Sequence, residues 1–407
     1  MNNDIVKPRG IGIISIFPII MFILDPYAIS DGGMAICDGL ILFMVLYLAL
    51  YNKMALYKPL FVLIGIDFVL SIISFLLTDS MYTYFNLSFK IAIVFSLYLF
   101  VYSGIWTQIL RYEDDFYKAV EIIGLLCAIL AILQFIFASA GVDFYDGKLP
   151  LPTGKNSYFG GVFDKNTGDL RVHSFFEEPS YLAFFEIPIT IHLLQKKKYI
   201  KSIICGMACI LSGSLIGIAG LAISLIMLLL FDTDTKISTK ILFVILIGAV
   251  VAVIVNLYNT NDGIKNLIDY YTQRLDNIDS SKQRDTSSYS QRINGYITLF
   301  DRYNYINKFI GVGFNQYPFY FRLAMDYSND IVSNLLNFGY IGITALICTL
   351  IAIARKMTGH GKVFFVIFCI LLAVDHSWFN SMFFYILTWV IVKSNTKQTN
   401  MFLEVKI

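Results

Sequence analysis

The chain has 407 residues, of which 57% are apolar and only 15% are charged, whereas a typical soluble domain carries about 25% charged residues. The mean hydropathy is +0.68 and the formal net charge is +2. This composition excludes a soluble enzyme, a disordered protein and a disulfide-rich secreted domain, and the balanced charge gives no reason to expect a nucleic-acid partner. A multi-spanning membrane protein accounts best for the apolar excess.

Twelve apolar segments follow one another along the chain, each close to the length that a membrane-crossing helix needs. The two longest apolar runs are divided at 212–214 and 375–377, because either run undivided would exceed the thickness of the hydrocarbon core. The sequence therefore predicts an all-α polytopic membrane protein, with about 12 transmembrane helices in a single membrane domain over residues 1–407. The predicted spans lie near 10–25, 35–51, 59–77, 87–109, 117–138, 180–194, 199–212, 214–231, 241–257, 331–354, 362–375 and 379–392.

Lysine and arginine are distributed unevenly between the predicted connections. The termini and the connections after even-numbered spans hold most of these cations, whereas the short connections on the other side hold none. Cytoplasmic loops carry the excess of Lys and Arg in membrane proteins. This asymmetry predicts that both termini are cytoplasmic and that two long polar segments, 139–179 and 258–330, are extracytoplasmic loops.

The two long loops are the natural place to look for function, because loops of this length are uncommon unless they have a role. The first loop ends with Arg171, His173, Glu177 and Glu178, directly before Pro179, which suits the first turn of a helix. Arginine offers a planar fork that matches phosphate or carboxylate. The two glutamates can act as acids or bases, or can simply complement a helix start; for Glu177 alone the second interpretation is favoured.

The second loop contains a predicted amphipathic helix. Ile293, Tyr296, Ile297 and Phe300 recur at i, i+3, i+4 and i+7. We expect this helix to lie on the membrane with its apolar stripe towards lipid. Arg292 then lies in its first turn, where a bound phosphate would also meet free backbone N–H groups; for Arg292 taken alone, a solvated side chain on the amphipathic helix is the favoured interpretation.

Several charged residues fall inside predicted spans, where such residues usually face the bundle interior. Glu186 follows Glu178 by eight residues, two turns along one helix face, so we expect it to extend the same site. Structural pairing, or a position near a span end, accounts for Asp38, Asp67 and Glu121.

The sequence contains no Walker A, HExxH, GxSxG or paired-cysteine motif. No cluster of His, Asp and Glu has the spacing of metal ligands. We therefore expect no cofactor and a metal-independent reaction, in which the substrate itself supplies the energy.

Four short motifs, in this order, resemble the O-antigen polymerase and O-antigen ligase superfamily of bacterial surface-polysaccharide assembly. The topology of about a dozen spans with two large outward loops extends the resemblance over most of the chain. The first motif is Arg171 followed by residues 178–180, and the second is residues 212–217. The third is residues 290–292 followed by residues 311–313, and the fourth is residues 337–342. The resemblance implies a GT-C-like membrane glycosyltransferase of the bacterial cytoplasmic (inner) membrane that uses undecaprenyl-pyrophosphate-linked glycans as donor and acceptor.

The resemblance also implies roles for individual residues. Arginines of the two loops hold the pyrophosphate in this superfamily, and the matching positions are Arg171 and Arg292. Arg302 and Gly313 fit an Arg-x10-Gly pattern that some polymerases have. Arg302 is therefore an alternative to Arg292 as the pyrophosphate-binding arginine of the second loop. Ligases commonly carry a His-Asn pair where residues 328–329 are Ser-Asn, which disfavours a ligase.

The resulting prediction is a Wzy-type polymerase of lipid-linked repeat units, with a chain-length regulator of the Wzz type as a possible partner. The alternatives are an O-antigen ligase and a lipid-linked glycan flippase or other transporter; long Arg-rich outward loops and the lack of an internal repeat argue against a transporter. The predicted base is Glu178, followed by His173 or His376; His376 lies at an outer turn beside Asp375, where a solvated loop position explains it equally well. Other predicted substrate contacts are Arg302, Arg322, Glu177, Glu186, Tyr158, Phe159 and Tyr317.

Overall fold

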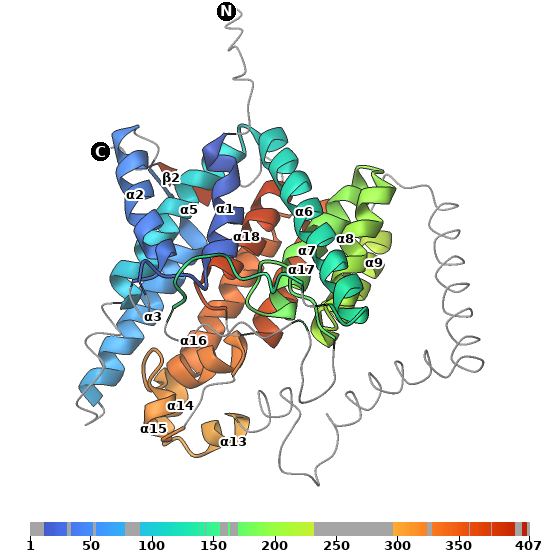
Figure 1. Cartoon of the computed structure of the whole chain (residues 1–407). Helices are drawn as coiled ribbons and strands as arrows, with labels where there is room; N and C mark the ends of the chain where they lie inside the picture. The colour runs from blue at the N-terminus through green and yellow to red at the C-terminus, as the bar shows by residue number, and fades with distance from the viewer. Residues whose placement is uncertain are drawn as a thin grey trace, which may run out of the picture.

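The structure is a computed structural model, and it describes residues 12–30, 34–51, 54–77, 90–142, 144–154, 162, 170–231, 296–323, 328–357, 359–375, 377–394 and 401–404. Figure 1 shows helices running side by side, with three short helices gathered below them. The elements are α1 (Ile13–Leu24), α2 (Ile36–Leu50), β1 (Ala55–Tyr57), α3 (Lys58–Leu77), the π-helical turn η1 (Lys90–Phe95), α5 (Ser96–Ile109), α6 (Glu113–Ser139), α7 (Pro179–Gln195), α8 (Tyr199–Leu211), α9 (Leu215–Phe231), α13 (Tyr296–Asp301), α14 (Tyr305–Ile310), α15 (Tyr317–Tyr320), α16 (Asp330–Ala354), α17 (Gly359–Val374), α18 (Ser381–Lys393) and β2 (Phe402–Glu404).

Helices occupy eleven of the twelve segments that hydropathy predicts, η1 and α5 together filling one of them. The twelfth segment, near 241–257, lies outside the described residues. Among the described helices, α3, α6 and α16 are long and apolar enough to cross a membrane, while the other apolar helices are shorter. Large apolar side chains point outward from the apolar helices; Leu76 of α3, for example, is 73% exposed. Exposed apolar side chains of this kind are typical of helices that lipid, and not water, covers.

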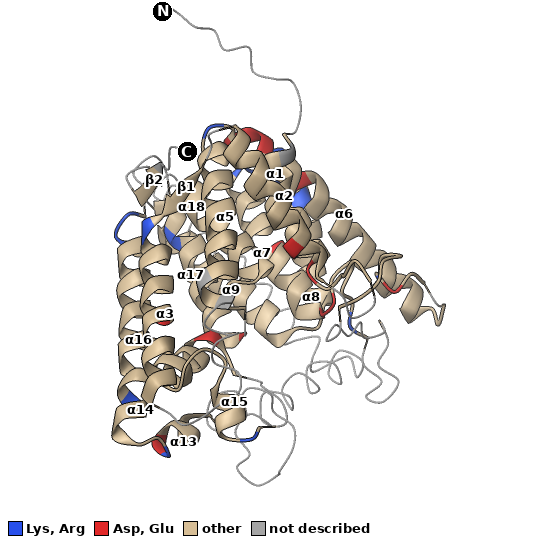
Figure 2. Cartoon of the chain, turned by 90° about the vertical axis from the view of Figure 1, so that its left-hand side faces the viewer, with Lys and Arg blue, Asp and Glu red and all other residues tan. Residues whose placement is uncertain are grey.

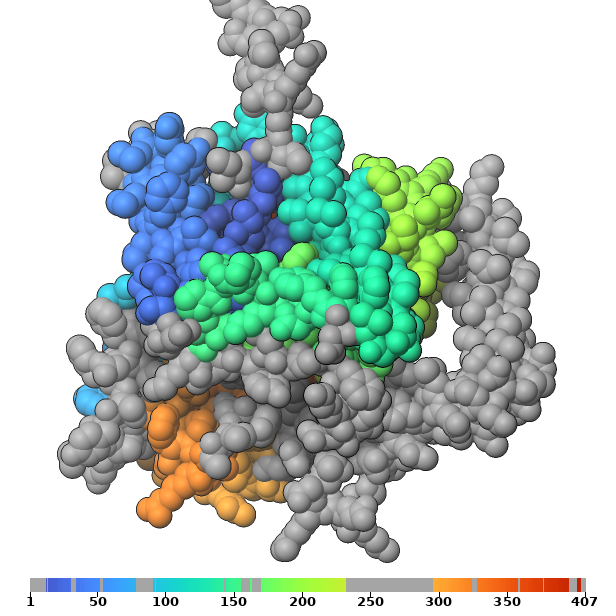
Figure 3. Space-filling view, in the orientation of Figure 1, coloured from blue at the N-terminus to red at the C-terminus, as the bar shows by residue number. Residues whose placement is uncertain are grey.

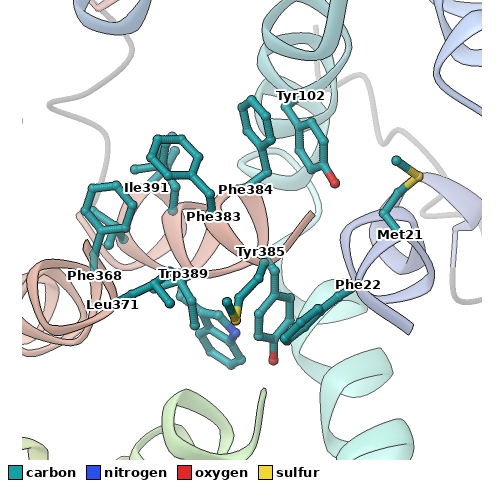
Figure 4. Close-up of a cluster of buried hydrophobic side chains, with 14 of the residues drawn as sticks. Met21, Phe22, Tyr102, Phe368, Leu371, Phe383, Phe384, Tyr385, Trp389 and Ile391 are labelled. Atoms are coloured by element: carbon teal, nitrogen blue, oxygen red, sulfur yellow. The ribbon is translucent and has the colours of Figure 1, made fainter. Parts of the chain in front are cut away.

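Helix α18 forms the centre of the bundle, because every residue from Ser381 to Val392 is buried. Its aromatic side chains reach neighbouring helices in several directions (Figure 4). Phe384 stacks on Tyr102 of α5 with ring centroids 4.3 Å apart, and the Tyr385 hydroxyl donates to the Phe185 carbonyl of α7 at 3.1 Å. Such close aromatic packing fixes the helices whose ends carry the candidate site.

One end of the bundle is basic. Figure 2 shows most of the described Lys and Arg at the upper helix ends. There Glu121 pairs with Lys198 and Lys201, which confirms the predicted structural pairing of this carboxylate. The Lys393 ammonium lies 2.7 Å from His192 Nδ1 at the same end. The long loops meet the helices at the opposite end.

Candidate functional site

The first loop ends in a helix start, as predicted. Pro179 occupies the first turn of α7, and Glu178 is the preceding residue, with an extended backbone of φ −129° and ψ 149°. The Glu178 side chain is exposed, and its Oε2 accepts a hydrogen bond from Ser180 Oγ at 3.1 Å. This arrangement projects a carboxylate from the N-terminal end of α7 because the N-cap residue leaves the helix geometry.

A glutamine of α6 holds the loop that leads to this helix start. Gln134 Nε2 donates to the carbonyl oxygens of Tyr145 (3.1 Å) and Ser174 (3.3 Å), while its Oε1 accepts from Ser174 N at 2.8 Å. Gly147, at φ +84°, packs so closely that an added Cβ would lie 1.6 Å from the Ser174 carbonyl oxygen. Only glycine fits such a contact in this conformation.

A second set of contacts ties the same loop to the connection between α1 and α2. The Ala28 amide donates to the Pro152 carbonyl at 2.9 Å, and the Tyr27 hydroxyl accepts from the Leu149 amide at 2.8 Å. Figure 3 shows the described part of the loop, in green, lying across this face of the molecule below α1. The loop is therefore a strap fastened to α1 and α6; we call residues 144–154 and 170–178 the strap.

The strap places two glutamates directly before α7, at the helix ends opposite the basic end. Glu177, Glu178, Asp25 and Asp375 all lie within electrostatic reach of Tyr181, in the first turn of α7. Asp25 follows the end of α1, and Asp375 follows the end of α17. We call Asp25, Glu177, Glu178 and Asp375 the carboxylate cluster; sequence reasoning placed the two glutamates in a site but missed Asp25.

Asp25 is the best-defined carboxylate of the cluster. Its Oδ1 accepts a hydrogen bond from Ser381 Oγ, the first residue of α18, at 2.7 Å. Burial, together with the nearby carboxylate of Asp38, raises the pKa of Asp25 from 3.8 to about 6, against the lowering effect of the Ser381 hydrogen bond. A carboxylate with a pKa in this range can accept a proton near neutral pH.

Arg171 and His173 lie in the strap, a few residues before the cluster. The Arg171 amide donates to the Val162 carbonyl at 2.8 Å, and its side chain is half-buried. His173 is buried, and its Nδ1 lies 2.7 Å from the Phe176 carbonyl oxygen. Arg171 therefore shares one loop segment with Glu177 and Glu178, while His173 contacts the backbone of the loop itself.

The second loop behaves differently from the prediction. A helix forms over Tyr296–Asp301, but Tyr296 and Phe300 are buried against Tyr303, Val312 and Leu336. Tyr296 and Phe300 of the apolar stripe therefore pack on protein, so the expectation that the stripe faces lipid is wrong for these two residues; Ile297 is 45% exposed, and Ile293 lies outside the described residues. The 3.6-residue period identifies an apolar face without saying what covers it.

Other predicted contacts in this loop are split between surface and interior. Arg302 and Arg322 are exposed, and Arg322 has a left-handed backbone at φ 54°. Tyr317 is fully buried, with its hydroxyl 2.5 Å from Ser328 Oγ. Its ring is part of the packing of the loop, so it offers no open face to a sugar.

Two carboxylates lie deep in the bundle and away from the cluster. Glu186 is fully buried beside Cys127 and Cys205, with α6 and α8 covering it. It shares a helix face with Glu178, but the bundle closes over α7 before that point, so the expectation that Glu186 extends an open site is wrong. Asp67 lies mid-way along α3 and is buried, which contradicts a place near a span end.

Three predicted site residues, Arg292, Tyr158 and His376, lie outside the described residues, as does Phe159. Among the residues that the structure describes, no group of three or more His, Cys, Asp or Glu side chains could hold a metal ion.

Comparison with known proteins bears on the broad class of the chain. Residues 201–347 match the model of the O-antigen ligase family. The match supports the O-antigen polymerase and ligase superfamily. Together with the apolar helices, it indicates a membrane protein of polysaccharide biosynthesis, of the glycosyltransferase-like kind that this superfamily comprises. No curated protein matches the chain.

The matched segment runs from α8 into α16 and includes the helices of the second loop. Arg171 and the carboxylate cluster lie outside it. The family match and the site at the strap are therefore two separate observations, and the match does not distinguish a polymerase from a ligase.

Proposed function

We propose that the chain is a polymerase of undecaprenyl-pyrophosphate-linked oligosaccharide repeat units, which transfers the growing glycan to a new lipid-linked repeat. The observation that carries this proposal is the strap, which holds Arg171 a few residues before Glu177 and Glu178, directly ahead of the start of α7. A cation for a leaving phosphate and a carboxylate for an acceptor hydroxyl are the two groups that glycosyl transfer from a pyrophosphate needs.

The role of Arg171 follows from where charge develops. Breaking the bond between the anomeric carbon and oxygen leaves negative charge on the departing pyrophosphate. A guanidinium that is already in position stabilises this charge most at the transition state, where stabilisation increases the rate. Arg171 supplies one such group from the first loop, and Arg292, with Arg302 as its competitor, supplies the second.

Two carboxylates are candidates for the base that takes the proton of the acceptor hydroxyl. Glu178 is exposed at the start of α7. Asp25 is held at Oδ1 by Ser381, and its raised pKa suits proton transfer near neutral pH. The burial of His173 favours a role in shaping the strap over a role as base.

The residues at the position of the ligase His-Asn pair favour a polymerase over a ligase. Asn329 caps α16, with its Oδ1 accepting from the Val332 amide at 2.9 Å. Ser328 contacts the buried Tyr317 hydroxyl. Both side chains are engaged in holding the start of α16, and neither offers the imidazole that a ligase would use.

The proposal includes a location and partners. The chain lies in the bacterial cytoplasmic membrane as one membrane domain with 12 spans, both termini in the cytoplasm and the loops 139–179 and 258–330 outside. It works without a metal ion, and a Wzz-type protein regulates its product length. The gathering of Lys and Arg at one end of the helices (Figure 2) supports this orientation, because cytoplasmic loops carry the excess of these residues.

A deletion strain tests the function and separates its alternatives. A polymerase deletion leaves surface glycans of single repeat units, since synthesis, flipping and ligation of the unit continue. A ligase deletion leaves lipid A core without glycan and long chains on the lipid carrier. A flippase deletion leaves the units inside the cell. Long surface chains that persist in the deletion strain would refute the proposal.

A further inference from the structure

Helix α14 exposes the side chains that a water-facing helix would bury. Tyr305 is 77% exposed, Ile306 is 52% exposed and Phe309 is 41% exposed. The polar Asn307 of the same helix is buried. This is the inverse of the usual arrangement in a soluble protein, and an exposed apolar patch of this kind marks a binding surface.

The exposed face of α14 continues onto the outward face of α16. The ring centroids of Tyr305 and Phe309 are 4.9 Å apart, and Phe309 meets Tyr340 of α16 at 5.7 Å. Ile347 and Ile351 lie on the same face of α16 as Tyr340, towards the C-terminal end of the helix, and are also exposed. Because α16 is one of the helices long and apolar enough to cross a membrane, we expect lipid to cover this face.

Backbone contacts fix α14 at one level beside α16. Helix α16 is interrupted at Gly339, which has φ 62°, and an added Cβ there would lie 2.6 Å from the Lys308 carbonyl oxygen. The Gly313 amide donates to the Asn337 carbonyl at 2.8 Å. From the other side, Ser74 of α3 donates to the Gly311 carbonyl at 3.3 Å.

We propose that α14 is an interfacial anchor that binds the outer-leaflet phospholipids at the boundary between headgroups and acyl chains. Tyr305, Ile306, Phe309 and Tyr340 form the contact surface. Tyrosine rings favour this boundary because one end of the side chain is apolar and the other is polar. Lys308, whose ammonium lies 6.0 Å from the Phe300 ring centroid, extends from the same helix towards the headgroup phosphates.

Lipid fits this surface better than a protein partner does. The patch on α14 is not bordered by polar residues on the side of α16. It continues without a break into the exposed apolar side of α16 at Tyr340 and Ile341. The apolar surface that lies away from the spans provides a contrast. Phe319 of the short helix α15 is 62% exposed but belongs to neither α14 nor α16, so we expect water to cover it.

The anchor gives the second loop a function in the proposed reaction. It holds the turn at 311–313 at the level where the pyrophosphate of a lipid-linked substrate meets the membrane surface. This consequence depends on the proposed function, whereas the lipid contact itself depends only on the membrane character of the chain.

Photo-crosslinking in liposomes tests the anchor without any measurement of activity. Tyr305, Phe309 or Phe319 is replaced by p-benzoylphenylalanine, and each full-length variant is reconstituted into phosphatidylethanolamine and phosphatidylglycerol vesicles and irradiated. We expect phospholipid adducts, detected by mass spectrometry, at 305 and 309 at least ten times more often than at 319. All three sites are exposed aromatic positions, so the replacement should not disturb folding.

Two results would overturn the inference. Adduct yields at 305 and 309 no higher than at 319 would show that water covers α14. A crosslinked dimer as the main product would show that a second copy of the chain covers it. Either result would leave the polymerase proposal intact, since a reconstituted chain that extends lipid-linked glycans would still do so.

Discussion

The two long loops are held to the helices in different ways. The strap of the first loop is fastened by the Gln134 side chain at one point and by the Ala28 amide and the Tyr27 hydroxyl at another, and it carries charged residues. The second loop is fastened by its backbone, through Gly311 and the interruption of α16 at Gly339, and it presents aromatic residues to the outside. The comparison teaches that one loop provides chemistry, and that the other provides a fixed position at the membrane surface.

The largest effect should come from the cation of the first loop. We expect Arg171→Lys to lower the rate of chain extension by about 10²–10³, because lysine keeps the charge but loses the bidentate fork. Protein levels should stay normal. The measurement is the rate of repeat-unit addition by purified protein in liposomes.

Lys148→Arg, in the same strap, is the matched control and should be silent, since its side chain is exposed. Normal chain extension by Arg171→Lys would show that Arg171 is not part of the site. The difference in function between the two loops would then have lost its support on the side of the first loop.

The second prediction breaks the backbone fastening of the second loop. In Gly311→Ala the added Cβ would lie 2.0 Å from the Asn337 carbonyl oxygen, at φ +73°. With ψ at −163°, this backbone lies in a region that is essentially restricted to glycine, which alone costs roughly 1–3 kcal/mol for another residue, and the overlap must add to this because two backbones have to separate. The loss of thermal stability in detergent measures the effect.

Gly141→Ala separates the two contributions. Gly141 has nearly the same φ, +70°, but nothing lies within 4 Å of its added Cβ. We expect a clearly larger loss of melting temperature for Gly311→Ala than for Gly141→Ala. Equal losses would show that the contact with Asn337 does not hold the loop.

The third prediction loosens the strap without touching a charge. Gln134→Leu leaves the Ser174 amide and the carbonyls of Tyr145 and Ser174 without this partner, which typically costs about 1–3 kcal/mol. We expect faster hydrogen exchange in residues 170–178 and unchanged exchange in residues 305–314. Gln134→Glu keeps the acceptor for the Ser174 amide and should have a smaller effect; equal acceleration in both loops would argue against separate fastenings.

The fourth prediction concerns pH and is the smallest. Because burial and Asp38 raise the pKa of Asp25 to about 6, this carboxyl is neutral below that pH and ionised above it. Activity that uses Asp25 as base should therefore rise through about pH 6. Asp25→Asn should abolish this rise, and Ser381→Ala should move it to higher pH, because the Ser381 hydrogen bond lowers the pKa.

The stability of the fold should change with pH in the opposite direction to the activity. A folded-state pKa above the unfolded value of 3.8 means that the neutral carboxyl favours folding, so Asp25 costs stability as pH rises from about 4 to 6. Asp25→Asn should flatten this loss in a pH series of melting temperatures. A pH–rate rise that survives in Asp25→Asn would assign the base to Glu178 or to another group.

Hydropathy predicted the helices well because an apolar run is a local property of the chain. The ranges of α3, α6 and α16 follow the predicted spans within a few residues. The same local logic identified the helix start at Pro179. It also identified the helix over Tyr296–Asp301, but periodicity does not reveal whether protein or lipid covers an apolar face, so its orientation was predicted wrongly.

The candidate site was predicted only in part because its members are distant in sequence. Glu177 and Glu178 stood out beside Arg171, whereas Asp25 belongs to no motif and meets them only when α1 packs on α7. A carboxylate directly after the first apolar run was the available signal. Glu186 was misjudged because helical spacing gives the face of a residue but not the depth at which neighbouring helices close over it.

The most direct test of the central claim is chain extension by the purified protein. The protein is reconstituted into liposomes that carry undecaprenyl-pyrophosphate-linked repeat units of a single size, with and without lipid A core, and the products are separated by gel. The account predicts a ladder of longer lipid-linked glycans that forms without lipid A core and is lost in Arg171→Lys. Glycan found only on lipid A core, or units that cross the bilayer but stay single, would contradict it.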